Sequence, residues 1–271
     1  MEKINSLEIS DASKKVYSSI LKRFVKHGFD IDKKITLKNV EKLINKVDKT
    51  SSKLDLLNLI IVIGEMPDKT MIELKQLRKE LQHLRVENNI EKMNIKGDTL
   101  LKYDIFQQML NDFYEKKKYK AYILNYLMVT YGLRNLDLDV IICHKKCDDI
   151  DDKKNYLIVS GQKVKYIRNV YKTSKKYGPK EHNIKGNEKL IEAIKKVPTG
   201  HILEQSNTIG NELRKLLIMK EADSFKMVID HYYDLEDTKK INELSESRGT
   251  SIGTIRNFYN INAEKEIIRE V

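Results

Sequence analysis

The chain has little of several residue types, with no tryptophan, two cysteines and three prolines among 271 residues. So few prolines permit long helices nearly everywhere. Two cysteines do not make a disulfide framework. The sequence also lacks a run of about 18 apolar residues and an apolar segment behind a basic N-terminus. We therefore expect no membrane span and no secretion signal, and we place the protein inside the cell.

The two cysteines raise the question of a metal site. Cys143 and Cys147, with His144 between them, could contribute ligands. A structural zinc site needs a second pair of ligands at finger-like spacing, and the sequence offers none. Nothing resembles a nucleotide-binding loop or an acidic metal cluster. We expect no metal and no cofactor.

Basic residues outnumber acidic ones, with 51 Lys and Arg against 40 Asp and Glu and a net charge of +11. This excess favours a polyanionic partner, either nucleic acid or an acidic membrane surface. The charge balance does not choose between them, and a plain basic surface in a lysine-rich composition is the alternative. Hydrophobic residues make up 40% of the chain, enough to bury a core.

The first region reads as helices, expected over residues 9–28, 36–47, 52–64 and 68–93. Ser10 or Asp11 is placed to cap the first helix, and Gly28 to end it. The fourth helix carries a stripe of leucines at three- and four-residue steps. Because this stripe lasts less than two heptads, it predicts core packing and not a coiled coil. The stripe consists of Leu74, Leu77, Leu81 and Leu84.

Residues 94–99, with the sequence NIKGDT, are the best linker candidate. We therefore expect a helical DNA-binding domain over residues 1–95 and a second domain over residues 96–271. Both parts are basic, as two jaws closing on one duplex would be.

The second part begins with two more helical stretches, residues 100–118 and 119–132, and then changes period. Three short β-type runs follow at residues 155–160, 165–173 and 181–185, and Gly178-Pro179 marks a turn between the last two. After Pro198 the pattern is helical to the end. The sequence therefore predicts a mainly α fold with a small antiparallel β-sheet.

Four separated motifs stand in the second part: YGLRNLDL (131–138), VYKTSKKYG (170–178), ADSFKMVIDHYY (222–233) and RGTSIGTIRNFY (248–259). Their order and spacing resemble the tyrosine recombinases, the phage integrase family, and especially the branch of large DNA viruses, virophages and related mobile elements. The resemblance covers roughly residues 97–261. The first region resembles the core-binding domain of that family only in being helical and basic.

The resemblance implies cleavage and rejoining of DNA strands. Tyr259 stands where the nucleophile of the family attacks a phosphodiester and forms a 3′-phosphotyrosyl link. A free phenol has a pKa of about 10, so positioned cations and donors must stabilise its deprotonation and the phosphoryl oxygens. The covalent link conserves the energy of the broken bond, and neither ATP nor a metal is required.

Three positions follow the pattern of the family. Arg134 matches its first arginine, whose planar fork grips two phosphate oxygens. Asp137 matches an acidic position that orients this arginine. Lys172 matches the hairpin lysine that protonates the departing 5′-oxygen, and it is expected at the end of a β-strand.

The segment around Lys172 is rich in basic residues, so any of several lysines could act as the acid. As a group these residues read as a ribbon that contacts the DNA backbone. The expected DNA contacts are Lys163, Lys165, Arg168, Lys175, Lys176 and Lys180.

Other positions depart from the family. Lys226 would take the place of the second arginine, keeping its charge but losing the bidentate fork. Asp223 falls where a histidine is expected, and His231 nearby, at the wrong offset, reads as a helix-surface residue. Thr250 replaces the histidine of Gly-His-Ser, so it can donate a hydrogen bond but cannot carry a proton.

The expected partner is double-stranded DNA, with no membrane. Relatives dock a C-terminal tail on a neighbouring subunit, so residues 262–271 imply assembly on DNA as a dimer or tetramer. The substituted positions leave a second hypothesis open, a catalytically lapsed DNA-binding or architectural protein on the same scaffold. A third is an unrelated basic helical nucleic-acid binder.

Overall fold

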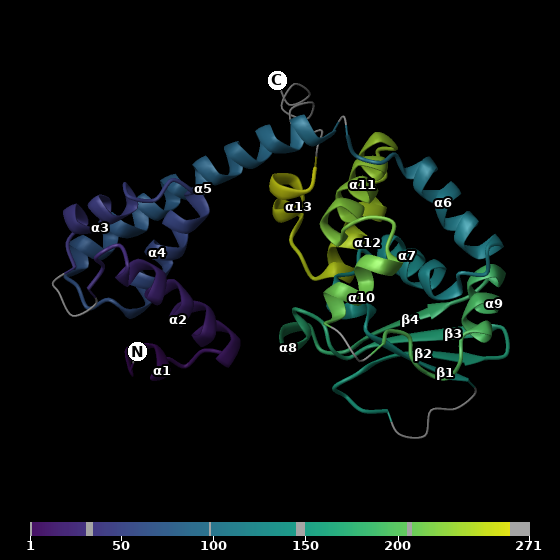
Figure 1. Cartoon of the computed structure of the whole chain (residues 1–271). Coiled ribbons are helices and arrows are strands. Elements are labelled where there is room, and N and C mark those ends of the chain that lie inside the picture. Colours follow the sequence, from purple (N-terminus) through teal and green to yellow (C-terminus); the bar gives the residue numbers. More distant parts are fainter. Residues whose placement is uncertain (1, 31–34, 98, 145–149, 205–207, 261–271) are drawn as a thin grey trace. The chain divides into compact units, whose positions relative to one another are not determined.

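The computed structural model describes residues 2–30, 35–97, 99–144, 150–204 and 208–260. The protein is mainly helical with a small mixed sheet of five strands (Figure 1). It divides into two compact units, Met1–Glu91 and Lys92–Val271. The boundary falls within one helix, α5 (Asp68–Gly97). The segment expected as a linker is therefore helical as far as Gly97.

Unit 1 is a group of helices around one apolar core. It contains α1 (Glu2–Asn5), α2 (Asp11–Val25), α3 (Leu37–Ile44), α4 (Thr50–Ile63) and the first part of α5. The predicted cap of α2 is confirmed, because the Ser10 side chain accepts a hydrogen bond from the N–H of Ser13. Six apolar side chains of α4 are buried, and this helix supplies much of the core.

The leucine stripe on α5 packs only in part as predicted. Leu74 is buried in the core of unit 1, and Leu77 and Leu81 pack against that core. The prediction is confirmed for these three residues. It is wrong for Leu84, whose side chain is 45% exposed.

Unit 2 holds the sheet and the remaining helices. Its helices are α6 (Tyr103–Glu115), α7 (Tyr119–Tyr131), the 3-10 helix η1 (Asn135–Leu138), α8 (Ser174–Tyr177), α9 (Glu188–Lys196), α10 (Ile209–Leu216), α11 (Glu221–Asp234), α12 (Thr238–Arg248) and α13 (Ile252–Phe258). Its strands are β1 (Val140–His144), β2 (Asn155–Ser160), β3 (Lys163–Arg168), β4 (Lys180–Ile184) and β5 (Gly200–His201).

The sheet has the strand order β4-β3-β2-β1-β5. Strands β2, β3 and β4 form an antiparallel meander, but β1 pairs with β2 in parallel, with Val140 opposite Asn155. The prediction of an antiparallel sheet is therefore wrong for this pair. The run predicted at 155–160 is confirmed as β2, whereas β3 ends at Arg168, short of the predicted 173.

One apolar core joins the helices of unit 2 to one face of the sheet (Figure 1). Helix α7 is buried along most of its length and lies within this core. The opposite face of the sheet carries a smaller cluster of Cys143, Tyr156 and Ile167. No helix among the described residues is both long and apolar enough to cross a membrane.

Candidate functional site

The site begins where α7 ends. Gly132 caps the helix in the left-handed conformation, with φ of +62°. A Cβ at this position would lie 2.8 Å from Cε2 of Phe225, so both backbone and packing require glycine. The chain then extends through Arg134 and turns into η1. Arg134 is thereby placed directly after a buried helix.

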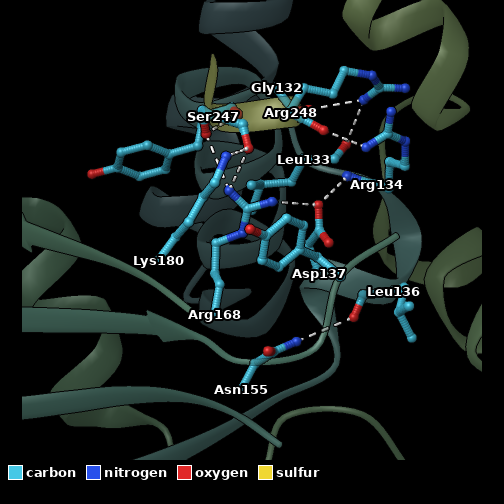
Figure 2. Close-up of polar contacts among 12 residues, drawn as sticks. Gly132, Leu133, Arg134, Leu136, Asp137, Asn155, Arg168, Lys180, Ser247 and Arg248 are labelled. Carbon is cyan, nitrogen blue, oxygen red and sulfur yellow. Dashed lines mark hydrogen bonds and ion pairs between the residues drawn. The ribbon is translucent and has the colours of Figure 1, made fainter. Parts of the chain in front are cut away.

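Asp137 is fully buried and lies below Arg134 (Figure 2). Its Oδ2 accepts a hydrogen bond from the main-chain N–H of Arg134 at 2.8 Å and another from Nη2 of Arg168 at 2.9 Å. The hydroxyl of Tyr166 donates to the main-chain carbonyl of Asp137 at 2.7 Å. Asp137 thus holds the main chain of Arg134. The guanidinium that pairs with the Asp137 carboxylate is that of Arg168.

Arg168, expected as a DNA contact, has no exposed side-chain surface. Besides Asp137, its guanidinium binds Ser247, with Nη1 2.9 Å from the carbonyl oxygen and 3.1 Å from Oγ. The Ser247 hydroxyl donates in turn to the carbonyl of Tyr131 at 2.7 Å. The prediction of a DNA contact is therefore wrong for Arg168, which ties β3 to the end of α12.

Arg248, the last residue of α12, is 1% exposed. Its Nη1 donates to the carbonyls of Gly132, at 2.8 Å, and Leu133, at 3.2 Å. Its Nη2 lies 2.6 Å from Oε1 of Glu221, and its guanidinium lies over the ring of Phe225 at 4.1 Å. A buried arginine needs such partners because an uncompensated charge in the interior is costly. Arg248 therefore joins the ends of α7, α11 and α12.

The side chain of Arg134 is half-buried and donates from Nη1 to the carbonyl of Arg248 at 2.5 Å (Figure 2). Burial lowers the pKa of Arg134, and the positive charge of Arg248 lowers it further. Asp137, Glu221 and Tyr259 oppose this effect.

Tyr259 is the C-cap residue of α13 and is half-buried. Its ring meets that of Phe225 edge to face, with centroids 4.8 Å apart, and the guanidinium of Arg248 lies 5.4 Å from its centre. Arg134 and Tyr259, predicted from the first and last motifs, thus both contact Arg248, Arg134 through its main-chain carbonyl and Tyr259 through its guanidinium.

The second motif packs on the same region. Gly249 has φ of +62°, and a Cβ there would lie 2.2 Å from Oγ1 of Thr173. The exposed Lys172 precedes this threonine in the turn before α8, beyond the end of β3 and not at a strand end as expected. On the other side of Gly249, the N–H of Thr250 donates to the carbonyl of Ser245 at 3.0 Å. Thr173 and Gly249 are in contact. Lys172 and Thr250 stand next to them in the sequence and therefore belong to the same region.

Lys226, the expected replacement for the second arginine, is half-buried on α11. The residues of α11 that contact Arg248 are Glu221 and Phe225. At about 100° per residue, Lys226 projects from a neighbouring face of the helix. The structure places an acid, Glu221, next to Arg248.

The basic residues of the ribbon have different surroundings. Lys163, Lys175 and Lys176 are exposed. Lys165 forms an ion pair with Glu181 at 2.6 Å. The Lys180 ammonium donates to the carbonyls of Glu246 and Ser247 at the end of α12. Burial lowers the pKa of Lys180, and the positive charge of Arg168 lowers it further. The position of Lys180 stabilises a helix C-terminus.

Two other expectations concern histidine and cysteine. His231 is half-buried, and its ring stacks on that of Tyr103 with 4.0 Å between the ring centroids.

Cys143 is buried, and Nε2 of His144 lies 2.8 Å from the carbonyl oxygen of Val197. Cys147 and the C-terminal tail lie outside the described residues. In the described part of the chain, no group of three or more His, Cys, Asp or Glu residues could hold a metal ion.

The comparisons with known proteins are negative. Searches of protein-family models, of curated proteins and of solved structures found no match to this chain. The resemblance to tyrosine recombinases therefore stays an expectation from the sequence motifs.

Sequence reasoning missed Arg248 and Glu221. Arg248 stands directly before a helix-ending glycine inside the last motif, where a basic side chain reaches the final carbonyls of a helix. Glu221 begins α11, where an acid is favoured by the helix dipole. Each signal is ordinary alone, and only the fold shows that the two side chains meet.

Proposed function

We propose that the protein cleaves and rejoins strands of double-stranded DNA, with Tyr259 as the nucleophile. The observation that supports this best is that Arg134 and Tyr259, from the first and last motifs, both contact Arg248, Arg134 at its main-chain carbonyl and Tyr259 at its guanidinium. A phosphate near both would complete a phosphoryl-transfer site.

The proposed step can be written with its bonds. The phenolic oxygen of Tyr259 loses its proton to solvent and bonds to phosphorus, and the bond from phosphorus to the 5′-oxygen breaks. Arg134 stabilises the negative phosphoryl oxygens. Lys172, exposed in the turn before α8, supplies a proton to the 5′-oxygen, and the Thr250 hydroxyl is a further donor. Attack by a 5′-hydroxyl reverses the step and rejoins the strand.

Charge supports a DNA partner. Lys172, Lys175 and Lys176 are exposed in one short segment that packs against Gly249, the neighbour of Arg248. We call these three the hairpin lysines. A phosphate backbone bound by them would pass close to Arg134 and Tyr259.

A second candidate is a DNA-binding protein that has lost its chemistry. It is favoured by the surroundings of Arg248, whose guanidinium is occupied by Glu221 and two carbonyls. Fewer cations are then left for a phosphate. Loss of one donor from such a site lowers the rate by about 10²- to 10³-fold. The departures from the family at Lys226 and Thr250 would therefore lower the rate of strand cleavage.

A nicked suicide duplex tests the proposal. When such DNA is cleaved, a short fragment diffuses away and the protein stays covalently attached. We expect wild-type protein to form a band that resists denaturation and Tyr259→Phe to form none, while both bind DNA with steep salt dependence. Binding by wild type without attachment would favour the lapsed protein. Absence of DNA binding would contradict both candidates.

A further inference from the structure

Arg248 contacts both residues that the proposed function places at the phosphate. Its main-chain carbonyl accepts a hydrogen bond from Arg134 at 2.5 Å. Its guanidinium lies 5.4 Å from the centre of the Tyr259 ring. One residue therefore touches the proposed phosphate ligand with its backbone and the proposed nucleophile with its side chain.

The guanidinium of Arg248 is held on several sides. The carbonyls of Gly132 and Leu133 accept from Nη1, and Glu221 accepts from Nη2. The ring of Phe225 lies 4.1 Å from the guanidinium carbon and also meets the ring of Tyr259 edge to face. With 1% of its surface exposed, this side chain has little freedom to move.

We propose that Arg248 is a positioning residue, which sets the distance between the Tyr259 phenol and the Arg134 guanidinium across the phosphate. This inference rests on the proposed function. Arg248 does not itself reach the phosphate, because its terminal nitrogens are bound by Glu221 and the end of α7. Lysine cannot replace it, since an ammonium lacks the planar fork that binds carbonyls and carboxylate while stacking on a ring.

The same network contains a matched control. Arg168 is also fully buried, binds Asp137 and Ser247, and lies over an aromatic ring, that of Tyr171, at 4.9 Å. From β3 its contacts lead to Asp137 in η1, whose carboxylate also accepts from the main-chain N–H of Arg134, and to Ser247 in α12, and not to the ring of Tyr259. Arg168→Lys therefore disturbs a buried arginine of the same kind without removing the contact to the nucleophile.

The first test measures covalent attachment to the suicide duplex at saturating DNA. We expect Arg248→Lys to lower the attachment rate by about 100-fold, since misplacement by about 1 Å costs that much. DNA affinity should change by less than about 3-fold, because the hairpin lysines are untouched. Arg168→Lys should lower the rate far less. Equal loss in both variants, or an unchanged rate in Arg248→Lys, would overturn the inference.

The second test does not depend on activity. A 3-fluorotyrosine at position 259 reports the surroundings of that ring by ¹⁹F NMR. We expect its resonance to move in Arg248→Lys and to stay in Arg168→Lys. If wild type never attaches to DNA, the proposed function fails while this measurement still reports whether Arg248 places the ring. An unmoved resonance in Arg248→Lys would overturn the inference on its own.

A milder variant covers the case in which Arg248→Lys does not fold. Glu221→Gln keeps one acceptor oxygen for Nη2 of Arg248 but removes the charge that holds the guanidinium, and it gives up the hydrogen bond that Oε2 accepts from the N–H of Asn135. We expect about a tenfold lower attachment rate and a smaller move of the ¹⁹F resonance. A wild-type rate together with an unmoved resonance would contradict the positioning role.

Discussion

The guanidinium of Arg134 donates a hydrogen bond to the main-chain carbonyl of Arg248, with 2.5 Å between Nη1 and the oxygen. This hydrogen bond joins the turn after α7 to the last residue of α12. The direction of the Arg134 side chain therefore depends on where α12 ends. Because Gly249 ends that helix, changes at the glycine are expected to reach Arg134 without touching it.

The buried ion pair of Asp137 and Arg168 should be costly to break. Both side chains are fully buried, with 2.9 Å between Oδ2 and Nη2. We expect Asp137→Ala to lower the free energy of unfolding by about 3–5 kcal/mol, because it leaves an unpaired buried charge. Chemical denaturation measures this. The exposed pair of Lys116 and Asp112 is the control, and Asp112→Ala should cost less than about 1 kcal/mol. Similar losses in the two variants would contradict the account.

Gly249 should tolerate alanine less well than Gly161 does. Both have positive φ, +62° and +60°, but a Cβ at Gly161 would meet nothing within 4 Å. Gly161→Ala should therefore cost only the left-handed backbone penalty, about 1–2 kcal/mol. Gly249→Ala adds a collision with Thr173 and should cost at least about 1 kcal/mol more. Equal unfolding free energies for the two variants would mean that Thr173 does not pack on this glycine.

The pH dependence of stability should report His182. Its ring contacts those of Tyr131 and Tyr166, and burial lowers its pKa to about 4, helped by the charges of Arg168 and Lys180. The neutral ring is favoured in the folded protein, so the unfolded chain binds this proton first as pH falls below about 6.5. Stability is therefore fully present above about pH 6.5 and is lost toward pH 4.

The measurement is denaturant unfolding at pH 7 and pH 4 for wild type and His182→Phe, which keeps an aromatic ring. Wild type should lose on the order of 2 kcal/mol more than the variant over this range. Carboxylates elsewhere titrate equally in both proteins and cancel. The same loss in both would mean that His182 does not titrate abnormally.

The hairpin lysines should contribute to DNA binding through their position and not only through net charge. Changing Lys172, Lys175 and Lys176 together to Gln should weaken DNA binding and reduce the slope of log K against log salt by about 0.9 for each phosphate that is no longer neutralised. The matched control changes Lys116, Lys117 and Lys118, also exposed but just before the start of α7. A 13-residue helix separates that start from the end near Arg134. Equal effects would show that only net charge matters.

Periodicity and capping predicted much of the fold. The α2 cap at Ser10, the buried leucines of α5 and strand β2 follow local rules, since each depends on neighbouring residues. Strand β1 and its parallel pairing were missed because pairing direction depends on the whole connection and not on the strand. Helix α5 extends into the expected linker and ends at Gly97, because Asn94, Ile95 and Lys96 do not break a helix and the first glycine of the segment is its last helical residue.

The sequence predicted those site residues whose type and motif indicate a chemical role without knowledge of their partners. Arg134 and Tyr259 were chosen from their motifs, and in the fold each contacts Arg248. Arg168 was misjudged because a lysine-rich segment hides which of its alternating side chains faces inward. Arg248 could not be assigned a role, since its partners lie far away in the sequence, at the ends of other helices.

The most direct test of the central claim is to locate the attachment. The chain has 14 tyrosines, so trapping alone does not identify the nucleophile. Digestion of the complex with nuclease and protease, followed by mass spectrometry, finds the residue that retains a nucleotide. The account predicts that this remnant is on Tyr259 and on no other residue. A remnant on another side chain, or none from a duplex that is bound and saturated, would contradict it.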